Sequence, residues 1–142
     1  MSEWQTYIEN LMAPDSTGLL LVTKAAICGI EKGKENVWSS SPDFPITAEE
    51  IKKLVGDSST FSQCGVHIGG IKCLLLRNQL EEEGSFCMQL KTVADADGKT
   101  HGMCVGKTFK AVVIVKGAPD AGGGQLCSRV FNIVQHLRGS HL

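Results

Sequence analysis

Five short apolar stretches, separated by turn signals, constrain the fold of this chain more than any other feature. They lie at 64–68, 72–77, 85–92, 101–107 and 111–116. The separators are Gly69-Gly70, the acidic segment 81–84, Asp97-Gly98 and the segment 107–110. Turns at such short spacing leave no room for the crossover segments that parallel strands require. The pattern therefore predicts an antiparallel β-meander.

Helical patterns flank this predicted meander. Ser2 and Gln5 have the spacing of a capping box, and apolar residues then recur on one helical face as far as position 12. Thr47 and Glu50 form a second capping box at the start of a short helix. Further expected elements are strands at 19–30 and 37–40 and an amphipathic helix at 126–137. This order predicts a single α+β domain over residues 1–142, built around a central antiparallel sheet.

Charge and hydropathy exclude several classes of protein. The formal net charge is −1, whereas a dedicated nucleic-acid binder is usually basic over a whole face. No apolar run approaches the roughly 20 residues that a membrane-spanning helix needs. The opening MSEWQTY lacks the basic and apolar regions of a secretory signal. We therefore expect a cytoplasmic protein without a nucleic-acid partner.

The six cysteines are widely spaced along the chain. They are Cys28, Cys64, Cys73, Cys87, Cys104 and Cys127. Four of them stand within apolar runs that we expect to be strands, and free cysteine is among the most buried residue types. In the absence of a secretory signal, the pattern favours buried free thiols in a reducing compartment over a disulfide framework.

Two glycine-containing segments match ligand-binding loops only in part. The glycines of 117–124 have phosphate-loop spacing, but Gly123 stands where a lysine is required. After Asp95 and Asp97, Gly98 comes too early for a calcium loop, and a hairpin turn explains it without further assumptions. We expect neither a nucleotide nor a calcium ion at these segments.

Cys64, His67 and Cys73 have the chemistry of a partial zinc site or of a thiol–imidazole pair. Structural zinc needs four ligands at characteristic spacing, and the chain contains no Cys-x-x-Cys. Packing cysteines with a histidine at the rim are the favoured interpretation. The chain also lacks a Gly-x-Ser-x-Gly elbow. We therefore predict a protein that is not an enzyme and that holds no cofactor or metal.

Aromatic residues are scarce, at 6% of the chain, yet Trp4, Tyr7 and Trp38 all lie near its start. Trp4 and Tyr7 are three positions apart, so their rings project from the same side of the first helix. Periodicity leaves two interpretations open, because the two rings share their stripe with Ile8 and Leu11. The rings either belong to the core or form an exposed site. Burial is hardest for Trp4, which stands in the first turn, and this favours a site.

The segment 135–138, Gln-His-Leu-Arg, ends a helix that we expect beside the first one. An aromatic cluster at the two chain ends suits a polyproline II peptide. Such a peptide presents flat pyrrolidine faces for aromatic packing and unpaired carbonyls for indole N–H and phenol O–H donors. The chain ends are therefore predicted to form a peptide-binding site.

Residues along the whole chain resemble the profilin family. They are Trp4-Gln5, Tyr7-Ile8, Asn10-Leu11-Met12, Val37-Trp38, Ile46-Thr47, Gly69-Gly70, Lys72-Cys73, Arg77, Gly123-Gly124 and His136-Leu137-Arg138. The resemblance implies a central antiparallel sheet with the N- and C-terminal helices packed on one face. It also implies an actin-monomer-binding protein that regulates actin polymerisation in the cytoskeleton and docks to proline-rich ligands.

Two sets of site residues follow from the resemblance. Positions matching the proline-rich ligand site are Trp4, Tyr7, Trp38, His136 and Leu137. Positions matching the actin face are Lys72, Leu75, Arg77, Lys91, Gly124 and Phe131, with neighbouring Cys127, Ser128 and Asn132. Leu142 replaces the tyrosine with which the family commonly ends, so a weaker groove is expected.

Departures from the family on the actin side keep a second hypothesis open. Gly122 replaces a frequent histidine, Val93 and Ser128 replace frequent basic residues, and Ser85 and Asn132 replace frequent acidic ones. Because charged rim residues mainly tune specificity and on-rate, actin binding remains the leading hypothesis. The alternative is a profilin-like adaptor that binds proline-rich peptides or phosphoinositides and has weak actin affinity. The resemblance also implies that the actin-binding form contacts phosphoinositide lipids at the membrane surface, and the basic residues available for this are Lys72, Arg77, Lys91, Lys107, Lys110, Arg129 and Arg138.

Overall fold

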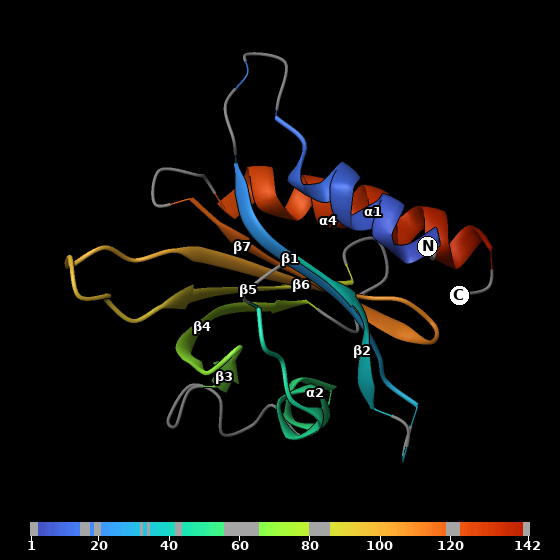
Figure 1. The fold of residues 1–142 in the computed structure, drawn as a ribbon, viewed down its shortest axis with the longest axis horizontal. Coiled ribbons are helices and arrows are strands. Elements are labelled where there is room, and N and C mark those ends of the chain that lie inside the picture. Colours follow the sequence, from blue (N-terminus) through green and yellow to red (C-terminus); the bar gives the residue numbers. More distant parts are fainter. Residues whose placement is uncertain are drawn as a thin grey trace.

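Three strands at the centre of the sheet, β1 (Val22–Gly29), β6 (Gly102–Lys107) and β7 (Ala111–Gly117), are buried over most of their length. Such continuous burial requires cover on both faces of a sheet. The computed structural model describes residues 3–14, 18, 21–31, 33, 35–41, 44–55, 66–79, 86–118 and 123–140. It supplies that cover with α1 (Glu3–Met12) and α4 (Gly123–Gly139) on one face and α2 (Ala48–Val55) on the other (Figure 1).

The remaining strands complete a seven-stranded antiparallel sheet. They are β2 (Asn36–Ser40), β3 (Val66–Ile68), β4 (Ile71–Gln79) and β5 (Cys87–Thr92). The order across the sheet is β2-β1-β7-β6-β5-β4-β3, and every neighbouring pair is antiparallel. β3 to β7 therefore follow chain order, which confirms the predicted meander. The β1–β2 hairpin joins beside β7, so the first and last parts of the chain become neighbours.

The two terminal helices share one apolar layer with the sheet, as predicted. In that layer α1 contributes Ile8 and Leu11, and α4 contributes four residues that are fully buried, Leu126, Val130, Val134 and Leu137. β1 and β7 supply the opposing side of the layer with alternate residues such as Ala25 and Val113. Burial of these side chains is the main stabilising term that holds both chain ends against the sheet.

The opposite layer is anchored by α2, whose capping box forms as predicted. The Thr47 N–H donates to Glu50 Oε1 (3.0 Å), and the Glu50 N–H donates to Thr47 Oγ1 (3.2 Å). The Glu50 carboxylate also accepts the N–H groups of Gly69 and Gly70, at 3.0 and 2.9 Å. These glycines form the tight β3–β4 turn with positive φ values of 61° and 81°, a conformation that glycine adopts without steric cost.

The first capping box is only partly described. Ser2 lies outside the described residues, and the Gln5 side chain accepts a hydrogen bond from Ser39 Oγ on β2 (2.8 Å). The Asp97-Gly98 hairpin turn forms as expected, because the N–H groups of Asp97 and Lys99 both donate to Asp95 Oδ1 at 2.9 Å. Side-chain hydrogen bonds therefore fix both the start of α1 against the sheet and the β5–β6 connection.

The five described cysteines are free thiols. Cys28, Cys73, Cys87 and Cys104 are buried, which confirms the prediction for these four, whereas Cys127 is half-buried. Cys64 lies outside the described residues. Across the described part of the chain, no helix has the length and apolar character required to cross a membrane.

Candidate functional site

Two aromatic rings of α1 lie partly exposed at the edge of the core. Ile8 and Leu11 on the same helix are buried to 2% and 1% relative exposure, whereas Trp4 and Tyr7 are only half-buried and pack against the rim of that layer. Their ring centroids are 5.7 Å apart with planes inclined by 47°, a usual geometry for an attractive aromatic pair. The two rings therefore belong partly to the core and partly to an exposed surface, which were the two interpretations that helical periodicity left open. One side of each ring is packed and the other remains accessible.

Trp38 joins this pair from β2 because Gly29 on the neighbouring strand leaves space for it. A side-chain carbon added to Gly29 would lie 2.5 Å from the indole Nε1 and 2.8 Å from Cε2. The indole therefore rests on the bare backbone of β1. From there its ring centroid is 4.8 Å from that of Trp4.

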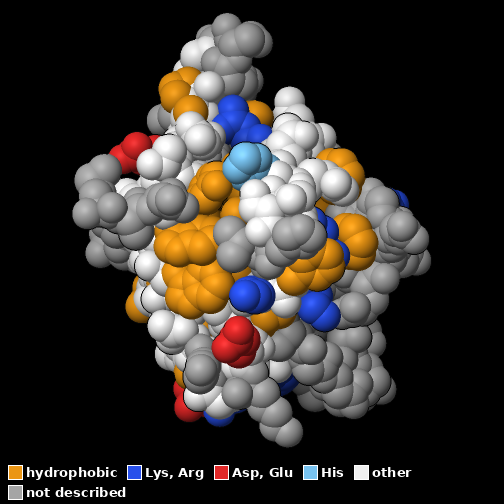
Figure 2. Space-filling model, turned by 90° about the vertical axis from the view of Figure 1, so that its right-hand side faces the viewer, with side chains coloured by type: hydrophobic (Ala, Val, Ile, Leu, Met, Phe, Trp, Pro, Cys, Tyr) orange, Lys and Arg blue, Asp and Glu red, His pale blue; other side chains and the backbone are white. Residues whose placement is uncertain are grey.

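His136, near the end of α4, completes a row of four rings. Its Nε2 lies 3.1 Å from the Tyr7 hydroxyl oxygen, and the two ring centroids are 5.6 Å apart. The order Trp38, Trp4, Tyr7, His136, here called the aromatic row, draws on β2, α1 and α4. Residues up to 132 positions apart in sequence are thereby brought together. Figure 2 shows hydrophobic side chains gathered on this side of the molecule, with a histidine beside them.

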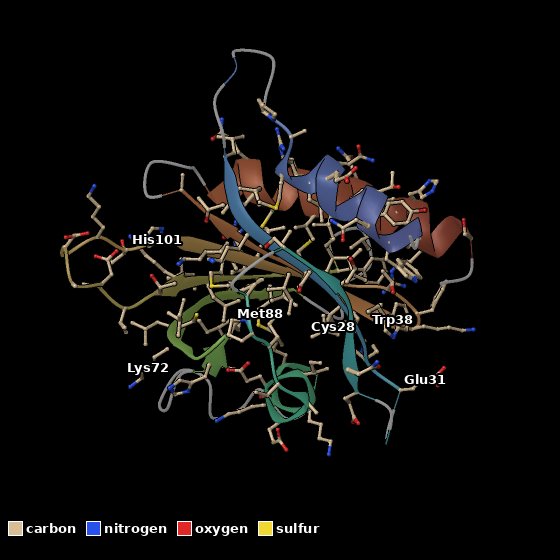
Figure 3. All side chains as sticks on the ribbon, in the orientation of Figure 1. Cys28, Glu31, Trp38, Lys72, Met88 and His101 are labelled. Atoms are coloured by element: carbon tan, nitrogen blue, oxygen red, sulfur yellow. The ribbon has the colours of Figure 1, made fainter. Side chains whose placement is uncertain are left out.

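The surface beside Trp38 is hollowed on two sides. A groove of about 380 Å³ is lined by Trp4, Asn36, Val37 and Trp38. A smaller hollow of about 160 Å³ is lined by Gly29, Glu31, Asn36 and Trp38. Figure 3 shows Trp38 on the same side of the molecule as Glu31, toward the end of the β1–β2 hairpin. Asn36 and Glu31 were not predicted from the sequence, because only the hairpin geometry places them beside the indole.

Leu137 takes no part in the surface of the row. It is fully buried in the layer between α4 and the sheet. Neighbouring helical positions differ in direction by about 100°, so an exposed His136 and a buried Leu137 are compatible with one regular helix. The side chain supports the row from within the core.

Two side-chain bridges fix α1 in place. Gln5 holds α1 to β2 through Ser39. Arg129 of α4 donates from Nη1 to the carbonyl oxygens of Leu11 (2.9 Å) and Ala13 (2.5 Å) at the other end of α1. The arginine thereby satisfies carbonyls that the helix end leaves unpaired. Both helices that carry rings of the row are thus positioned by contacts outside it.

A second candidate surface lies where β4 and β5 meet the start of α4. Leu74 pairs with Lys91 across the two strands, and Arg77 pairs with Gln89. Gln89 reaches α4 by donating from Nε2 to Cys127 Sγ (3.3 Å). The strand register therefore puts these side chains on the face of the sheet that α1 and α4 cover, beyond the edge of α4. Lys72 and Trp38 lie on opposite sides of the molecule, so the two candidate surfaces are separate (Figure 3).

The predicted actin-face residues divide between this surface and the core. Lys72, Arg77 and Lys91 are exposed on the strands, and Ser128 and Asn132 are exposed on α4. Cys127 and Phe131 are half-buried beside them, and Gly124 contributes only its backbone position in the first turn of α4. Most of the predicted residues are thus brought to one region.

Leu75 does not join this region. Its side chain packs against the α2-side core, while Leu74 and Leu76 on either side of it are 48% and 61% exposed. The two exposed leucines of β4 add apolar area to this surface, and the sequence pattern did not predict them. A continuous apolar run gives no alternation from which to read the two faces.

Cys73 and His67 do not form a thiol–imidazole pair, in agreement with the favoured interpretation of these residues. Cys73 pairs with Val66, and His67 pairs with Lys72. Cys73 is therefore buried on the α2 side, while His67 is exposed on the other face of the sheet. Burial raises the pKa of the Cys73 thiol to about 12, which keeps it protonated and unreactive. Cys64 lies outside the described residues, among which no three suitable side chains are placed to hold a metal ion.

Among the basic residues considered for phosphoinositides, Arg129 and Arg138 make hydrogen bonds within the protein. Arg129 binds the end of α1. Arg138 donates from Nε and Nη2 to the Lys107 carbonyl oxygen, at 3.0 and 2.8 Å, and its guanidinium stacks 3.5 Å from the centroid of the Phe86 ring. These contacts position the two guanidinium groups in structural roles.

Comparison with known proteins gives one consistent result. The family model for profilin matches residues 2–142. Human Profilin-1 is 36% identical over 144 residues, which cover 99% of each chain. Mouse profilin IIa, solved in complex with a double repeat from the FH1 domain of mDia1, has a TM-score of 0.88 at 30% identity and covers 99% of this chain and 100% of its own. Human profilin II has a TM-score of 0.84 at 31% identity, covering 95% and 98%.

Proposed function

The chain belongs to the profilin family, and on this premise we propose that it binds monomeric actin and proline-rich peptides on two separate surfaces. Profilins are non-enzymatic, so the protein acts by binding. In the proposed function, one surface holds an actin monomer while the aromatic row docks to proline-rich segments of proteins that promote filament assembly. The bound monomer is thereby delivered to growing filaments.

The aromatic row is the observation that carries this proposal. Trp4, Tyr7 and Trp38 are half-buried against the apolar layer, and the exposed His136 ring extends the row beside Tyr7. A polyproline II ligand loses little conformational entropy on binding and offers flat pyrrolidine faces to such rings. The hollows on the two sides of Trp38 provide room for prolines next to the indole.

Mouse profilin IIa supports the assignment of a peptide ligand, because its structure contains a double repeat from an FH1 domain. That protein and this chain match over nearly their full lengths. We extend the ligand class to this chain because it carries its own ring row. Trp4, Tyr7, Trp38 and His136 are the proposed contact residues, and Leu137 supports them from the core.

Tryptophan fluorescence gives a direct test, since the two tryptophans of the chain both lie in the row. Titration with a proline-rich peptide should change the emission saturably. Trp4→Ala should abolish binding, as measured by calorimetry with the same peptide. Leu74→Ala, on the second surface, is the matched control and should bind normally. An unchanged emission of the folded wild type at excess peptide contradicts the groove assignment.

The proposed actin surface combines an apolar centre with a basic rim. Leu74 and Leu76 are exposed, and Lys72, Arg77 and Lys91 stand near them on β4 and β5. Exposed apolar area supplies binding energy, while charged rims steer association and set specificity. This surface therefore suits a large protein partner with acidic residues at its contact.

Actin assembly separates the leading proposal from the adaptor alternative. Saturating protein should suppress spontaneous nucleation of pyrene-labelled actin. The double variant with Lys72→Glu and Lys91→Glu should weaken that effect, because it reverses the charge of the rim. Lys53→Glu on α2, an exposed lysine of the opposite layer, is the control and should act as wild type. If the wild type leaves nucleation unchanged but still binds proline-rich peptide, the adaptor function replaces the actin function.

A further inference from the structure

Three thiols meet between the sheet and the N-terminal half of α4. Cys127 on α4 and Cys104 on β6 have their Sγ atoms 3.0 Å apart. Cys87 on β5 belongs to the same apolar layer as Cys104 and interacts with both. Gln89, two positions along β5, donates to Cys127 Sγ. This thiol cluster lies outside the aromatic row and has no part in the proposed peptide site.

Glycines on both sides of Cys104 bring the sulfur atoms together. Gly102 and Gly106 face α4, where an added carbon would lie 3.1 Å from Leu126 Cδ1 and 2.3 Å from Val130 Cγ1, respectively. With no side chain at either position, α4 packs directly on the β6 backbone. Cys104 is the one residue between them whose side chain points toward the helix, and it meets Cys127 there.

The two sulfurs differ in exposure and in acidity. Cys104 is fully buried, whereas Cys127 is partly open to solvent. Hydrogen bonds from Cys104 and then Cys87 hold the pKa of the Cys127 thiol well below its usual value. The hydrogen bond to Cys127 raises the pKa of Cys104. These opposite shifts favour the thiolate, which is the nucleophilic form, at the more accessible Cys127 over the buried Cys104.

We propose that Cys104 and Cys127 form a redox modification site, at which a hydroperoxide converts the two thiols into a reversible disulfide between β6 and α4. A disulfide requires the sulfurs to approach to about 2.05 Å, so a movement of about 1 Å completes the bond. Gly102 and Gly106 already allow α4 to approach β6 closely on either side of Cys104.

The reaction proceeds in two balanced steps. The Cys127 thiolate attacks one oxygen of hydrogen peroxide, which breaks the O–O bond, forms a sulfenic acid and releases hydroxide. Cys104 sulfur then attacks the Cys127 sulfur and breaks its S–O bond, and the Cys104 proton goes to the departing sulfenic hydroxide, which leaves as water. One thiolate, one thiol and one hydrogen peroxide thus give the disulfide, one water and one hydroxide, with both sulfurs oxidised and the peroxide reduced. Two glutathione thiols reverse the change by exchange and leave as glutathione disulfide.

The two described cysteines outside the thiol cluster lack this combination. Cys28 and Cys73 lie in the opposite layer, and burial raises the pKa of each to about 12. Cys73 approaches a thioether, with its Sγ 3.4 Å from Met103 Sδ. A thioether cannot form a disulfide. Cys28 is therefore the matched control, a buried thiol of the same protein outside the thiol cluster.

Peptide mapping tests the proposal directly. After a brief treatment of the reduced full-length protein with hydrogen peroxide, thiols are blocked and the protein is digested with trypsin without reduction. Cleavage after lysine and arginine leaves Cys104 in peptide 100–107, Cys127 in 117–129 and Cys87 in 78–91. The expected product links 100–107 to 117–129, has lost two hydrogens and disappears on addition of glutathione.

Variants determine the pairing. Cys127→Ala, at a half-buried position, should abolish the product, and so should Cys104→Ala. Cys28→Ala should leave it unchanged. If Cys104→Ala fails to fold, the Cys127→Ala variant and the peptide map of the oxidised wild type are sufficient to identify the disulfide. A link from Cys87 to Cys127, a dimer through Cys127, or Cys127 over-oxidised without a link each overturns the proposal.

A consequence for actin rests on the proposed function. Cys127 stands among the proposed actin residues of α4, between Gly124 and Phe131, and the disulfide draws its sulfur inward and removes its negative charge. We expect oxidised protein to bind actin several-fold more weakly, with recovery after reduction. Equal affinity of the two forms overturns this regulation. If neither form binds actin, the proposed function fails, while the peptide map still decides the disulfide.

Discussion

Gly29 and Trp38 are in direct contact across β1 and β2, with the indole lying where any side chain at position 29 would project. The ring cannot keep this place beside a larger residue. Since Trp38 also borders both hollows and contacts Trp4, the absence of one side chain on β1 determines the geometry of one end of the aromatic row.

Gly29→Ala should weaken peptide binding without unfolding the protein. The added carbon would overlap three atoms of the indole, and relief of such overlap typically costs ~1–3 kcal/mol. Moving Trp38 should lower peptide affinity by about tenfold, which corresponds to about 1.4 kcal/mol. Calorimetric titration measures this change. Gly139→Ala, where an added carbon meets no neighbour within 4 Å, should retain wild-type affinity; equal affinities of both variants would disprove the role of Gly29.

Tyr7→Phe isolates the hydroxyl group at the centre of the row. The ring stays, but the contact of 3.1 Å with His136 Nε2 is lost, as is a donor for a ligand carbonyl. A typical hydrogen bond contributes about 1 kcal/mol, so we expect a several-fold rise in the peptide Kd. Thermal unfolding of the free protein is the control measurement and should change little, because the contact is exposed. An unchanged Kd would show that the hydroxyl does not contribute to binding.

Local sequence patterns predicted the elements of the fold well. The Thr47–Glu50 capping box and the turn at Gly69-Gly70 each depend on residues close together in sequence, and both form. What the pattern did not predict is that Glu50 joins them by accepting both glycine N–H groups. That contact spans 20 positions and exists only once α2 has packed beside the β3–β4 turn.

The candidate site was harder to predict, because it depends on which face of a strand or helix each side chain points to. The run Cys73-Leu74-Leu75-Leu76 is apolar throughout, so period-two alternation could not show that Leu75 points into the core and Leu74 outward. A register shift between Leu75 and Arg77 adds a further displacement. On α1, likewise, the helical stripe could not show where burial ends. In the folded chain Ile8 and Leu11 are buried between α1 and the sheet, whereas Trp4 and Tyr7 remain half-buried.

Acid should weaken the β5–β6 connection through Asp95. Hydrogen bonds from the N–H of Lys99, from His101 and from the N–H of Asp97 hold the pKa of the Asp95 carboxyl below its usual value of 3.8. A carboxyl with a lowered pKa in the folded state stabilises the fold above pH 3.8, and this contribution is lost as the pH falls through the lower folded pKa. Asp95→Asn keeps an oxygen acceptor but cannot titrate.

Urea unfolding from neutral pH to below 3.8 tests this assignment. The wild type should lose more stability over that range than Asp95→Asn does. Asp97→Asn, in the same turn, should follow the wild type. Parallel pH profiles of the wild type and Asp95→Asn would mean that another group carries the acid dependence.

Gly106→Ala should separate α4 from the sheet and lower the free energy of unfolding. The added carbon would meet Val130 Cγ1 at 2.3 Å and Val134 Cγ2 at 2.6 Å, both in a fully buried layer that has little freedom to adjust. Overpacking of this kind costs ~1–3 kcal/mol, measured as a lower urea midpoint. Gly102→Ala is the graded comparison, because its added carbon would lie 3.1 Å from a single terminal methyl of Leu126. Gly102→Ala should lower the free energy of unfolding less than Gly106→Ala, since one rotatable methyl can move where two β-branched side chains cannot. Equal losses of stability in the two variants would show that Gly106 does not set the distance between α4 and β6.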